Sequence, residues 1–434
     1  MQTSAGTWPR IPVGELLERV VRPVRLDPDQ EYQEIGIRSH CKGIFHKPRV
    51  TGREIGSKRV YWVEPGCLIF NIIFAWEQAV AITTKKEHGL IASHRFPMYR
   101  SINGELLPEY AYLYFASPRG KHDLMLASPG GAGRNKTLGQ DELLRLRIPL
   151  PSPPEQRRIV EILSTWDRAI EQLEKLIAAK RRLKQGLMQQ LLTGRRRFPE
   201  FGKPASPGRV PEDWKPVHLG DIARIRFSNV DKKSNGDEHC VRLCNYLDVY
   251  NNQYITADMS FMQATARLAE IEKYALRPGD VLITKDSETA DDIANAATVV
   301  DELPGVICGY HLGILRPKRG VSGFFLGQLL MLPAIRYQFT RIANGVTRFG
   351  LGLTSVSKVP LWLPPHEEQE RIATVLMQVD REIARLSRSI ECFREQKRGL
   401  MQKLLTGQVR VRGAGTQAEK SHPPATPQKR KRRR

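Results

Sequence analysis

Apolar residues recur at alternating intervals of four and three over residues 155–194 and again over residues 368–407. This spacing places one apolar stripe along a helix and is typical of a coiled-coil seam. Lys180 and Lys184 interrupt the first stripe, and Lys397 interrupts the second. Each segment is therefore predicted to form one long helix. The stripe positions are Ile159, Leu163, Trp166, Ile170, Leu173, Ile177, Leu187 and Leu191 in the first segment, and Ile372, Leu376, Val379, Ile383, Leu386, Ile390, Phe393, Leu400 and Leu404 in the second.

The two segments are copies of each other. Without gaps, 20 of their 40 aligned positions are identical. A single stripe suits an ordinary amphipathic core helix, but two matching stripes in one chain can bury each other, so we predict an intramolecular coiled coil. Trp166 is interpreted as a packing residue of that seam. Gly186 and Gly399 occupy equivalent interior positions, where glycine costs about 1 kcal/mol relative to alanine; close helix approach and a local kink are both open explanations.

Residues that start and stop helices flank both stripes. In SPPE, Ser152 suits an N-cap, Pro153 the first helical position, and Glu155 the third residue of a capping box. Thr193–Gly194 and the matching Thr406–Gly407 supply C-terminal stops. At about 1.5 Å per residue, each helix is expected to be about 55–60 Å long.

A globular segment precedes each helix, and the two segments share landmarks in the same order. Short β-type runs such as 67–73 and 281–284 alternate with helical stretches such as 110–116 and 324–331, which predicts mixed α+β domains. Between the landmarks the sequences diverge, so we interpret the segments as one fold used twice with different loops. The matching landmarks are WPRIPVGELL with WKPVHLGDIA, VEPGCLIFN with LRPGDVLIT, GLIASHRFPMYR with GVICGYHLGILR, GAGRNKTLG with NGVTRFGLG, and RIPLP with PLWLP.

Composition shifts mark a linker and a tail. The run beginning RRRFPEFG is rich in proline, glycine and charge, as expected of a linker. The final run, GTQAEKSHPPATPQKRKRRR, is of low complexity and basic, so we expect a disordered, electrostatically sticky tail, with a nuclear-localisation address as the alternative. The predicted segments are a first globular domain (1–152), a first long helix (153–194), a linker (195–213), a second globular domain (214–364), a second long helix (365–407) and the tail (408–434).

The charge balance points to a polyanionic partner. Lys and Arg outnumber Asp and Glu 68 to 46, which gives a formal net charge of +22. Residues 413–434 carry seven Lys or Arg and one Glu, so the body remains basic without the tail. Nucleic acid is the first candidate partner.

Several other protein classes are not indicated. The N-terminal run lacks the layout of a signal peptide, and no apolar run approaches the roughly 18 residues of a membrane span. We therefore expect a soluble, cytoplasmic protein with no membrane partner. The six cysteines form no CxxC pair; reduced thiols without a special role are expected, with structural zinc as the alternative.

Motifs for catalysis are also missing. The sequence has no GxxxxGK[ST] phosphate loop and no Asn/Asp-Pro-Pro-Tyr/Phe tetrapeptide of adenine methyltransferases. SPGGAGR (128–134) is glycine-rich but is not visibly set between a strand and a helix. DSETADD (286–292) is interpreted as a solvated acidic loop, against the alternative of a metal site. We expect no catalytic, cofactor-binding or metal-binding residue in this chain.

The order of these features resembles the specificity subunit of type I restriction-modification enzymes. Over about residues 8–411, each globular segment is followed by a proline-rich start, Glu-Gln, a heptad stripe and a Leu-Leu-Thr-Gly end. The resemblance implies an α+β fold with two target-recognition domains, separated by two long helices that form an antiparallel, pseudo-two-fold coiled coil. It also implies a non-catalytic, prokaryotic subunit that reads a bipartite, asymmetric site in double-stranded DNA.

The same resemblance implies protein partners that supply the chemistry. Two adenine methyltransferase (M) subunits use S-adenosylmethionine, and restriction endonuclease (R) subunits use ATP and magnesium, whereas the specificity subunit needs no cofactor. A stand-alone DNA-binding regulator that dimerises through its coiled coil is the alternative function.

Candidate DNA-binding residues lie near the shared landmarks. Bases are read through their edges in the grooves, whereas Lys and Arg on phosphates fix the register. Because the two domains diverge, we predict two different half-sites. For any single candidate, a surface salt bridge or solvent contact is the competing interpretation. The candidates are Ser93, His94, Arg95, Arg134, Asn135 and Lys136 in the first domain, and Lys285, Tyr310, His311, Thr347 and Arg348 in the second.

Overall fold

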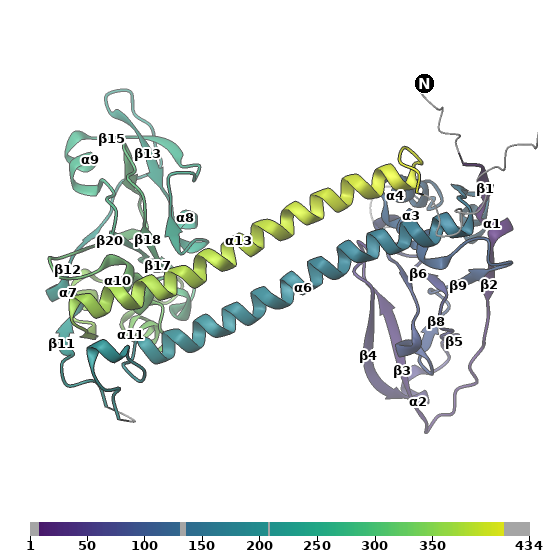
Figure 1. Ribbon diagram of the computed structural model, residues 1–434, viewed down its shortest axis with the longest axis horizontal. Helices are drawn as coiled ribbons and strands as arrows, with labels where there is room; N and C mark the ends of the chain where they lie inside the picture. The colour runs from purple at the N-terminus through teal and green to yellow at the C-terminus, as the bar shows by residue number, and fades with distance from the viewer. Residues whose placement is uncertain (1–7, 131–135, 207–208, 412–434) are drawn as a thin grey trace, which may run out of the picture. The chain divides into compact units, whose positions relative to one another are not determined.

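The chain forms two compact units joined by two continuous helices. The computed structural model describes residues 8–130, 136–206 and 209–411. Unit 1 contains the chain up to Leu173 and from Ser389 onward, and unit 2 contains Glu174–Arg388. The helices α6 (Pro153–Leu191) and α13 (His366–Leu405) each contribute one part to unit 1 and the rest to unit 2. Figure 1 shows both as continuous helices.

Unit 1 is a mixed α+β domain. Two four-stranded sheets have the strand orders β2-β9-β6-β7 and β4-β3-β8-β5, and β1 pairs with β10. The pairing of β3 with β8 is parallel, and the other pairs in these sheets are antiparallel. Besides its share of the long helices, it contains β1 (Arg10–Pro12), α1 (Val13–Leu16), β2 (Leu17–Val20), β3 (Glu31–Ile37), β4 (Ile44–Thr51), α2 (Gly52–Ile55), β5 (Val60–Trp62), β6 (Leu68–Phe70), η1 (Ala75–Glu77), β7 (Val80–Ile82), η2 (Lys85–Glu87), β8 (Ile91–Ser93), β9 (Met98–Ser101), α3 (Pro108–Ala116), α4 (Pro118–Leu126), α5 (Gln140–Arg145) and β10 (Arg147–Pro149).

Unit 2 has the same kind of architecture. Its sheets have the orders β12-β20-β16-β18-β14 and β15-β13-β19, with the two-stranded pairs β11–β22 and β17–β21. Besides its share of the long helices, it contains η3 (Pro199–Phe201), β11 (Lys215–His218), α7 (Leu219–Ile222), β12 (Ala223–Phe227), β13 (His239–Cys244), α8 (Tyr246–Tyr250), β14 (Tyr254–Ile255), β15 (Met262–Ala266), α9 (Leu268–Tyr274), β16 (Val281–Thr284), β17 (Asp286–Ser287), η4 (Ala290–Asp292), β18 (Ala296–Val299), β19 (Val306–Cys308), β20 (Leu312–Pro317), α10 (Gly323–Leu330), α11 (Pro333–Ile342), β21 (Phe349–Gly350), α12 (Leu353–Ser357) and β22 (Pro360–Leu363).

The predicted duplication of the globular fold is confirmed by the strand order. The run β2-β9-β6-β7 of unit 1 corresponds to β12-β20-β16-β18 of unit 2, and the parallel pair β3–β8 corresponds to β13–β19. In each unit two successive helices follow, α3 and α4 or α10 and α11, before the strand that precedes the long helix. Unit 2 adds β14, α8 and the β17–β21 pair to this shared framework.

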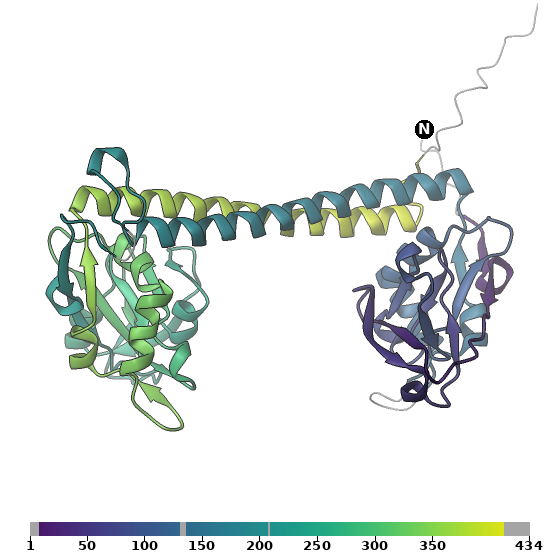
Figure 2. The ribbon, with the colours of Figure 1, turned by 90° about the horizontal axis from the view of Figure 1, so that it is seen from below.

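The two long helices run antiparallel within each unit. In unit 1, Ile159 and Leu163 share a core cluster with Leu404, and the Trp166 and Phe393 rings meet edge to face at 5.4 Å between centroids. Residue numbers therefore rise along α6 as they fall along α13. The side-by-side course is visible in Figure 2. Every residue of both predicted stripes is buried or half-buried, and Trp166 packs in the seam as expected.

Lysines inside the stripes form ion pairs rather than breaking the helices. In unit 2, Lys184 Nζ lies 2.7 Å from Asp380 Oδ1 and Lys180 Nζ lies 2.5 Å from Glu382 Oε2. In unit 1, Lys397 Nζ lies 2.5 Å from Asp167 Oδ1. The Lys184–Asp380 and Lys397–Asp167 pairs occupy equivalent positions of the repeat. The duplicated polar positions therefore pair with each other and help to set the register of the helices.

Glu155 joins three distant parts of unit 1. Its carboxylate accepts a hydrogen bond of 3.1 Å from Trp8 Nε1 and two hydrogen bonds, of 2.8 and 2.9 Å, from the guanidinium of Arg410. The sequence assigned Glu155 to a local capping box with Ser152. The structure uses the carboxylate instead to fasten the start of the domain and the segment after α13 to the start of α6.

Glu368 repeats this arrangement in unit 2. It accepts from Trp214 Nε1 at 3.0 Å and from Arg197 Nε and Nη2 at 2.9 and 2.7 Å. Arg197 also donates to Asp213 at 2.7 and 2.9 Å. The hydrogen bond to Glu368 is the main reason why the pKa of Arg197 is raised above its ordinary value. We call these two groups, Trp8–Glu155–Arg410 and Trp214–Glu368–Arg197, the clasps.

The glutamine after each clasp glutamate holds the loop that leads into α3 or α10. Gln156 accepts from the Leu107 backbone N–H at 2.8 Å and donates to the Glu105 carbonyl at 2.7 Å. Gln369 accepts from the Ser322 backbone N–H at 2.9 Å and donates to the Gly320 carbonyl at 3.4 Å. The repeated Glu-Gln pair therefore fixes each globular domain to a long helix.

The helix ends agree with the sequence, and the structure argues against one of the two explanations for the interior glycines. The helices end at Leu191 and Leu405, and Gly194 and Gly407 follow with φ values of +69° and +74°. A Cβ atom added at Gly186 or Gly399 would meet no atom within 4 Å. Close approach of another segment of the described chain is therefore not what requires glycine there.

Candidate nucleic-acid interface

One backbone junction in unit 1 brings the first candidate segments together. Ile72 follows β6, and its N–H donates to the Arg95 carbonyl at 3.0 Å. Its own carbonyl accepts from the Leu138 N–H at 2.8 Å. The turn that carries Ser93, His94 and Arg95 and the segment just before Leu138 therefore meet at the end of β6.

Unit 2 contains the same junction with a different residue at its centre. Lys285 follows β16, its N–H donates to the His311 carbonyl at 2.9 Å, and its carbonyl accepts from the Leu351 N–H at 2.9 Å. Ile72 and Lys285 thus hold equivalent places in the two units. Only backbone groups make these bonds, so the side chain at the centre is free to differ.

The segments near the Ile72 junction carry basic and aromatic side chains. His94 and Arg95 are exposed, and Ser93 is half-buried at the end of β8. The ammonium group of Lys136 lies 5.4 Å from the centre of the Trp76 ring, within the range of a cation–π interaction. Two further candidates, Arg134 and Asn135, lie outside the described residues.

The side chains around Lys285 form a tighter group. The ammonium of Lys285 lies 4.6 Å from the centre of the Tyr310 ring, and that ring contacts His311 at 4.0 Å between centroids. His311 Nδ1 lies 2.5 Å from Asp286 Oδ2 and 3.3 Å from Arg348 Nη2. The structure therefore gathers Lys285, Tyr310, His311 and Arg348 in one place, while Thr347 is exposed beside Arg348.

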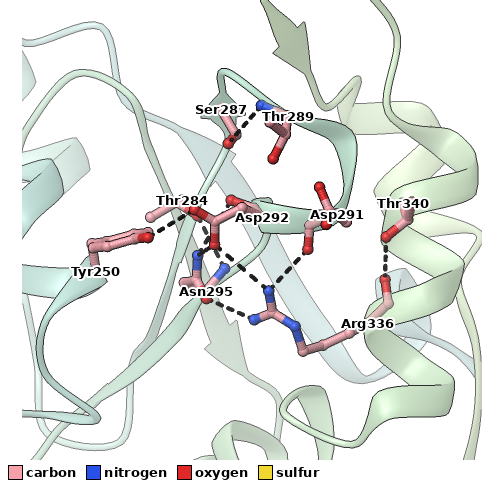
Figure 3. Close-up of polar contacts among 9 residues, drawn as sticks. All are labelled: Tyr250, Thr284, Ser287, Thr289, Asp291, Asp292, Asn295, Arg336 and Thr340. Atoms are coloured by element: carbon pink, nitrogen blue, oxygen red, sulfur yellow. Dashed lines mark hydrogen bonds and ion pairs between the residues drawn. The ribbon is translucent and has the colours of Figure 1, made fainter. Parts of the chain in front are cut away.

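The acidic run at 286–292 belongs to the framework of this site. Tyr250 donates to Asp292 Oδ2 at 2.8 Å, and Asn295 Nδ2 donates to Asp292 Oδ1 at 3.1 Å (Figure 3). Arg336 on α11 donates to the Asn295 side chain at 2.7 Å and to the Asp291 carbonyl at 3.2 Å. These bonds tie the acidic loop to α8 and α11, so the sequence-based picture of a merely solvated loop was incomplete.

Sequence reasoning missed one residue of this site and one residue beside it. Asp286 belongs to the acidic run, and its carboxylate orients His311. Val346 lies at the tip of the turn between α11 and β21, with 92% of its surface exposed. A carboxylate in an acidic run and a single valine in a loop carry no periodic signal. Asp286 follows the VLIT strand, however, and the end of a strand is where the other candidates cluster.

The described residues form neither a metal-binding cluster nor a membrane span. Among the described residues, no group of three or more His, Cys, Asp or Glu is placed to hold a metal ion. No helix in that part of the chain is both long and apolar enough to span a bilayer. The cysteines described are free thiols, and burial raises the pKa of Cys41 and Cys67 to about 11.

The family follows from a match over most of the chain. The model of the type I restriction modification DNA specificity domain matches residues 70–181 and 211–391, once in each repeat. The chain belongs to this family. It is accordingly a DNA sequence-specificity subunit of the type I restriction-modification class, and the regulator alternative is not favoured.

Two curated specificity subunits from Methanocaldococcus jannaschii show the extent of the similarity. The putative MjaX specificity subunit is 26% identical over 361 residues, covering 80% of this chain and 79% of its own. The MjaVIII specificity subunit is 25% identical over 268 residues, covering 62% of this chain and 63% of its own.

Solved structures agree on the fold of the specificity subunit. A chain from work on complex assembly and conformational transition of the type I R-M system is 20% identical, covers 93% of this chain and 98% of its own, and has a TM-score of 0.58. The S subunit from M. genitalium is 14% identical, covers 93% of this chain and 98% of its own, and has a TM-score of 0.55.

Proposed function

We propose that this specificity subunit reads a bipartite, asymmetric site in double-stranded DNA, with one half-site for each unit. The observation that carries the proposal is the duplicated junction, which presents different side chains on the same backbone frame. The segments that meet at Ile72 carry His94, Arg95 and Lys136, whereas those that meet at Lys285 carry Tyr310, His311 and Arg348. Different side chains at a base edge select different bases.

Each candidate DNA-binding residue has a defined role in this proposal. Exposed Arg and Lys side chains make the phosphate contacts that fix the register, and side chains at the junctions reach the base edges. The net charge of +22 supports such binding and predicts that affinity falls steeply as salt rises. Because each junction is rigidly bonded to its sheet, the two sites are preorganised.

The chemistry is assigned to partner chains. We infer that the subunit holds two adenine methyltransferase (M) subunits, which use S-adenosylmethionine, and that restriction endonuclease (R) subunits, which use ATP and magnesium, join the same complex. The duplicated clasps and Glu-Gln pairs support two equivalent docking places, because each unit meets its helix pair in the same way. The subunit itself then needs no cofactor.

Methylome sequencing tests the proposal. The chain is co-expressed with its methyltransferase subunit in cells that lack other adenine methylation, and cells with the methyltransferase alone serve as the control. The expected result is N6-methyladenine at one split motif, with two unrelated halves and a fixed gap, only when both chains are present. No motif, or an unsplit motif, would contradict the proposal.

A second measurement addresses the partners. Light scattering of the purified chain, followed by titration with the methyltransferase subunit, is expected to give a complex of two methyltransferase subunits with one specificity subunit. A chain that forms a homodimer and does not bind the methyltransferase subunit would instead support a stand-alone regulator.

A further inference from the structure

A short hairpin projects from unit 2 between α11 and α12. Asn344 and Gly350 exchange both backbone hydrogen bonds, at 3.0 and 2.8 Å, and close the turn. Gly345 has a φ of +145°, and a Cβ there would lie 2.0 Å from the Arg348 carbonyl oxygen. Only glycine fits this turn without rearrangement. We call residues 344–350 the reading hairpin; it is the yellow-green hairpin at the edge of unit 2 in Figure 2.

The reading hairpin is held by the frame of the site. Its last residues form β21, which pairs with β17 so that Asp286 faces Gly350 and Ser287 faces Phe349. The next residue, Leu351, donates its N–H to the Lys285 carbonyl at 2.9 Å. The hairpin therefore has a fixed position relative to Lys285 and His311, as a preorganised binding element requires.

The tip of the hairpin presents three different kinds of contact. Val346 is 92% exposed, and Thr347 and Arg348 are exposed beside it. The tip therefore offers an apolar group, a hydroxyl and a guanidinium to a partner surface. A two-stranded β-ribbon fits the major groove, where Arg pairs with guanine O6 and N7 and an apolar group contacts the thymine methyl.

Carboxylates beside the hairpin favour a contact with bases over a contact with phosphates. Arg348, Thr347 and Lys232 line a cleft of about 930 Å³ together with Asp286, Glu288 and Asp292. Three carboxylates in this lining would repel a sugar–phosphate backbone, whereas carboxylates can accept hydrogen bonds from the amino groups of cytosine and adenine. Base edges are therefore better partners for this cleft than phosphates.

We propose that the reading hairpin enters the major groove and that Arg348 and Val346 determine the sequence of the half-site read by unit 2. Asp286 acts as a positioning residue, because its carboxylate orients the His311 ring against the hairpin. This inference rests on the proposed function, since it names the residues that select one of its two half-sites. Arg348 selects guanine and Val346 selects an adjacent thymine.

Selection from random duplex DNA by the purified full-length chain tests the assignment. Arg348→Ala and Arg348→Lys should each reduce the preference for one guanine by roughly 5- to 150-fold. The lysine variant keeps the charge but lacks the forked geometry of guanidinium. Val346→Ser should weaken the preference for thymine at the neighbouring position. Arg319→Ala removes a comparable exposed charge from unit 2 and should leave the motif unchanged.

The outcomes separate this proposal from the proposed function. If Arg348→Ala selects the wild-type motif with uniformly lower affinity and a salt dependence shallower by about one ion, Arg348 binds phosphate and the hairpin assignment is wrong. A change confined to one half of the motif supports it. A wild-type chain that selects no sequence at all would contradict the proposed function itself.

Discussion

Replacing Glu368 by glutamine is expected to weaken unit 2 far more than the equivalent change weakens unit 1. The Glu368 side chain is 1% exposed and that of Arg197 is 4% exposed, so the substitution leaves a buried guanidinium without its main partner. Glutamine keeps the shape of the side chain and can still accept from Trp214. The loss is therefore electrostatic rather than steric.

The geometry gives the size of the effect. Removing one partner of a buried ion pair costs about 3–5 kcal/mol. Arg197 keeps a second carboxylate, Asp213, whose side chain is 45% exposed, so the lower end of about 3 kcal/mol is expected. In unit 1, the Arg410 side chain is 42% exposed and water can replace the missing charge. The Glu155→Gln change should therefore cost only about 1 kcal/mol.

Scanning calorimetry of the full chain measures both variants. For units of this size, 1 kcal/mol corresponds to a shift in Tm of about 2–4 °C, so about 6–12 °C is expected for Glu368→Gln and about 2–4 °C for Glu155→Gln. Glu370→Gln, in the same turn of α13 but exposed, is the matched control and should leave Tm nearly unchanged. Equal shifts for the two clasp variants would refute the reasoning from burial.

Two further changes test packing and protonation. Gly186→Ala and Gly399→Ala should each raise the free energy of unfolding by about 0.5–1 kcal/mol in urea titrations, because a Cβ there meets nothing within 4 Å. Gly120→Ala is the contrasting variant and should lower the free energy of unfolding, since its Cβ would lie 2.0 Å from a backbone carbonyl oxygen. Destabilisation by Gly186→Ala or Gly399→Ala would contradict the view that these positions have room for a side chain. Burial raises the pKa of Tyr99 from its ordinary 10 to about 12. The contribution of the protonated phenol to the free energy of unfolding is therefore complete below pH 10. It is lost as the pH rises toward 12, by up to about 1.4 kcal/mol per pH unit. Urea unfolding at pH 9 and pH 11 should show that the free energy of unfolding falls less for Tyr99→Phe than for the wild type. An equal fall in both proteins would contradict the role given to Tyr99.

The long helices could be predicted from the sequence because their signals are local and repeated. The heptad stripe, the proline at the start and the glycine after the end each depend on neighbouring residues. Because the helical segment is duplicated, each helix has a matching partner in the same chain, and the two apolar seams can bury each other. The antiparallel direction came from the family resemblance, and the pairing of Trp166 with Phe393 is consistent with it.

The clasps could not be predicted in the same way. Glu155 sits three residues after Ser152, which satisfies a local capping motif, yet its carboxylate binds Trp8 and Arg410. These partners are 147 and 255 residues away in sequence. A local pattern cannot reveal a tertiary competitor for the same oxygen atoms. The repetition of Trp, Glu and Arg in both halves was the available signal.

The candidate site was predicted in outline because its residues follow matching strands. Tyr310, His311 and Lys285 were chosen from aligned landmarks, and the structure places them in contact. Asp286 and Val346 were missed because a carboxylate in an acidic run and an exposed valine look ordinary in a sequence. Their positions depend on the β17–β21 pairing and on a turn fixed by glycine, which only the folded chain reveals.

The duplicated junction separates the groups that hold the fold from those that we propose meet DNA. At Ile72 and Lys285 the framework bonds use backbone N–H and carbonyl groups alone. An apolar residue and a lysine therefore occupy the same place without changing the sheet or the segments that meet there. Side chains at this position and on the hairpin can vary while the clasps and Glu-Gln pairs stay fixed. Under the proposed function, a new half-site thus requires changes at a few exposed side chains, and neither the helix pair nor the other unit has to change with them.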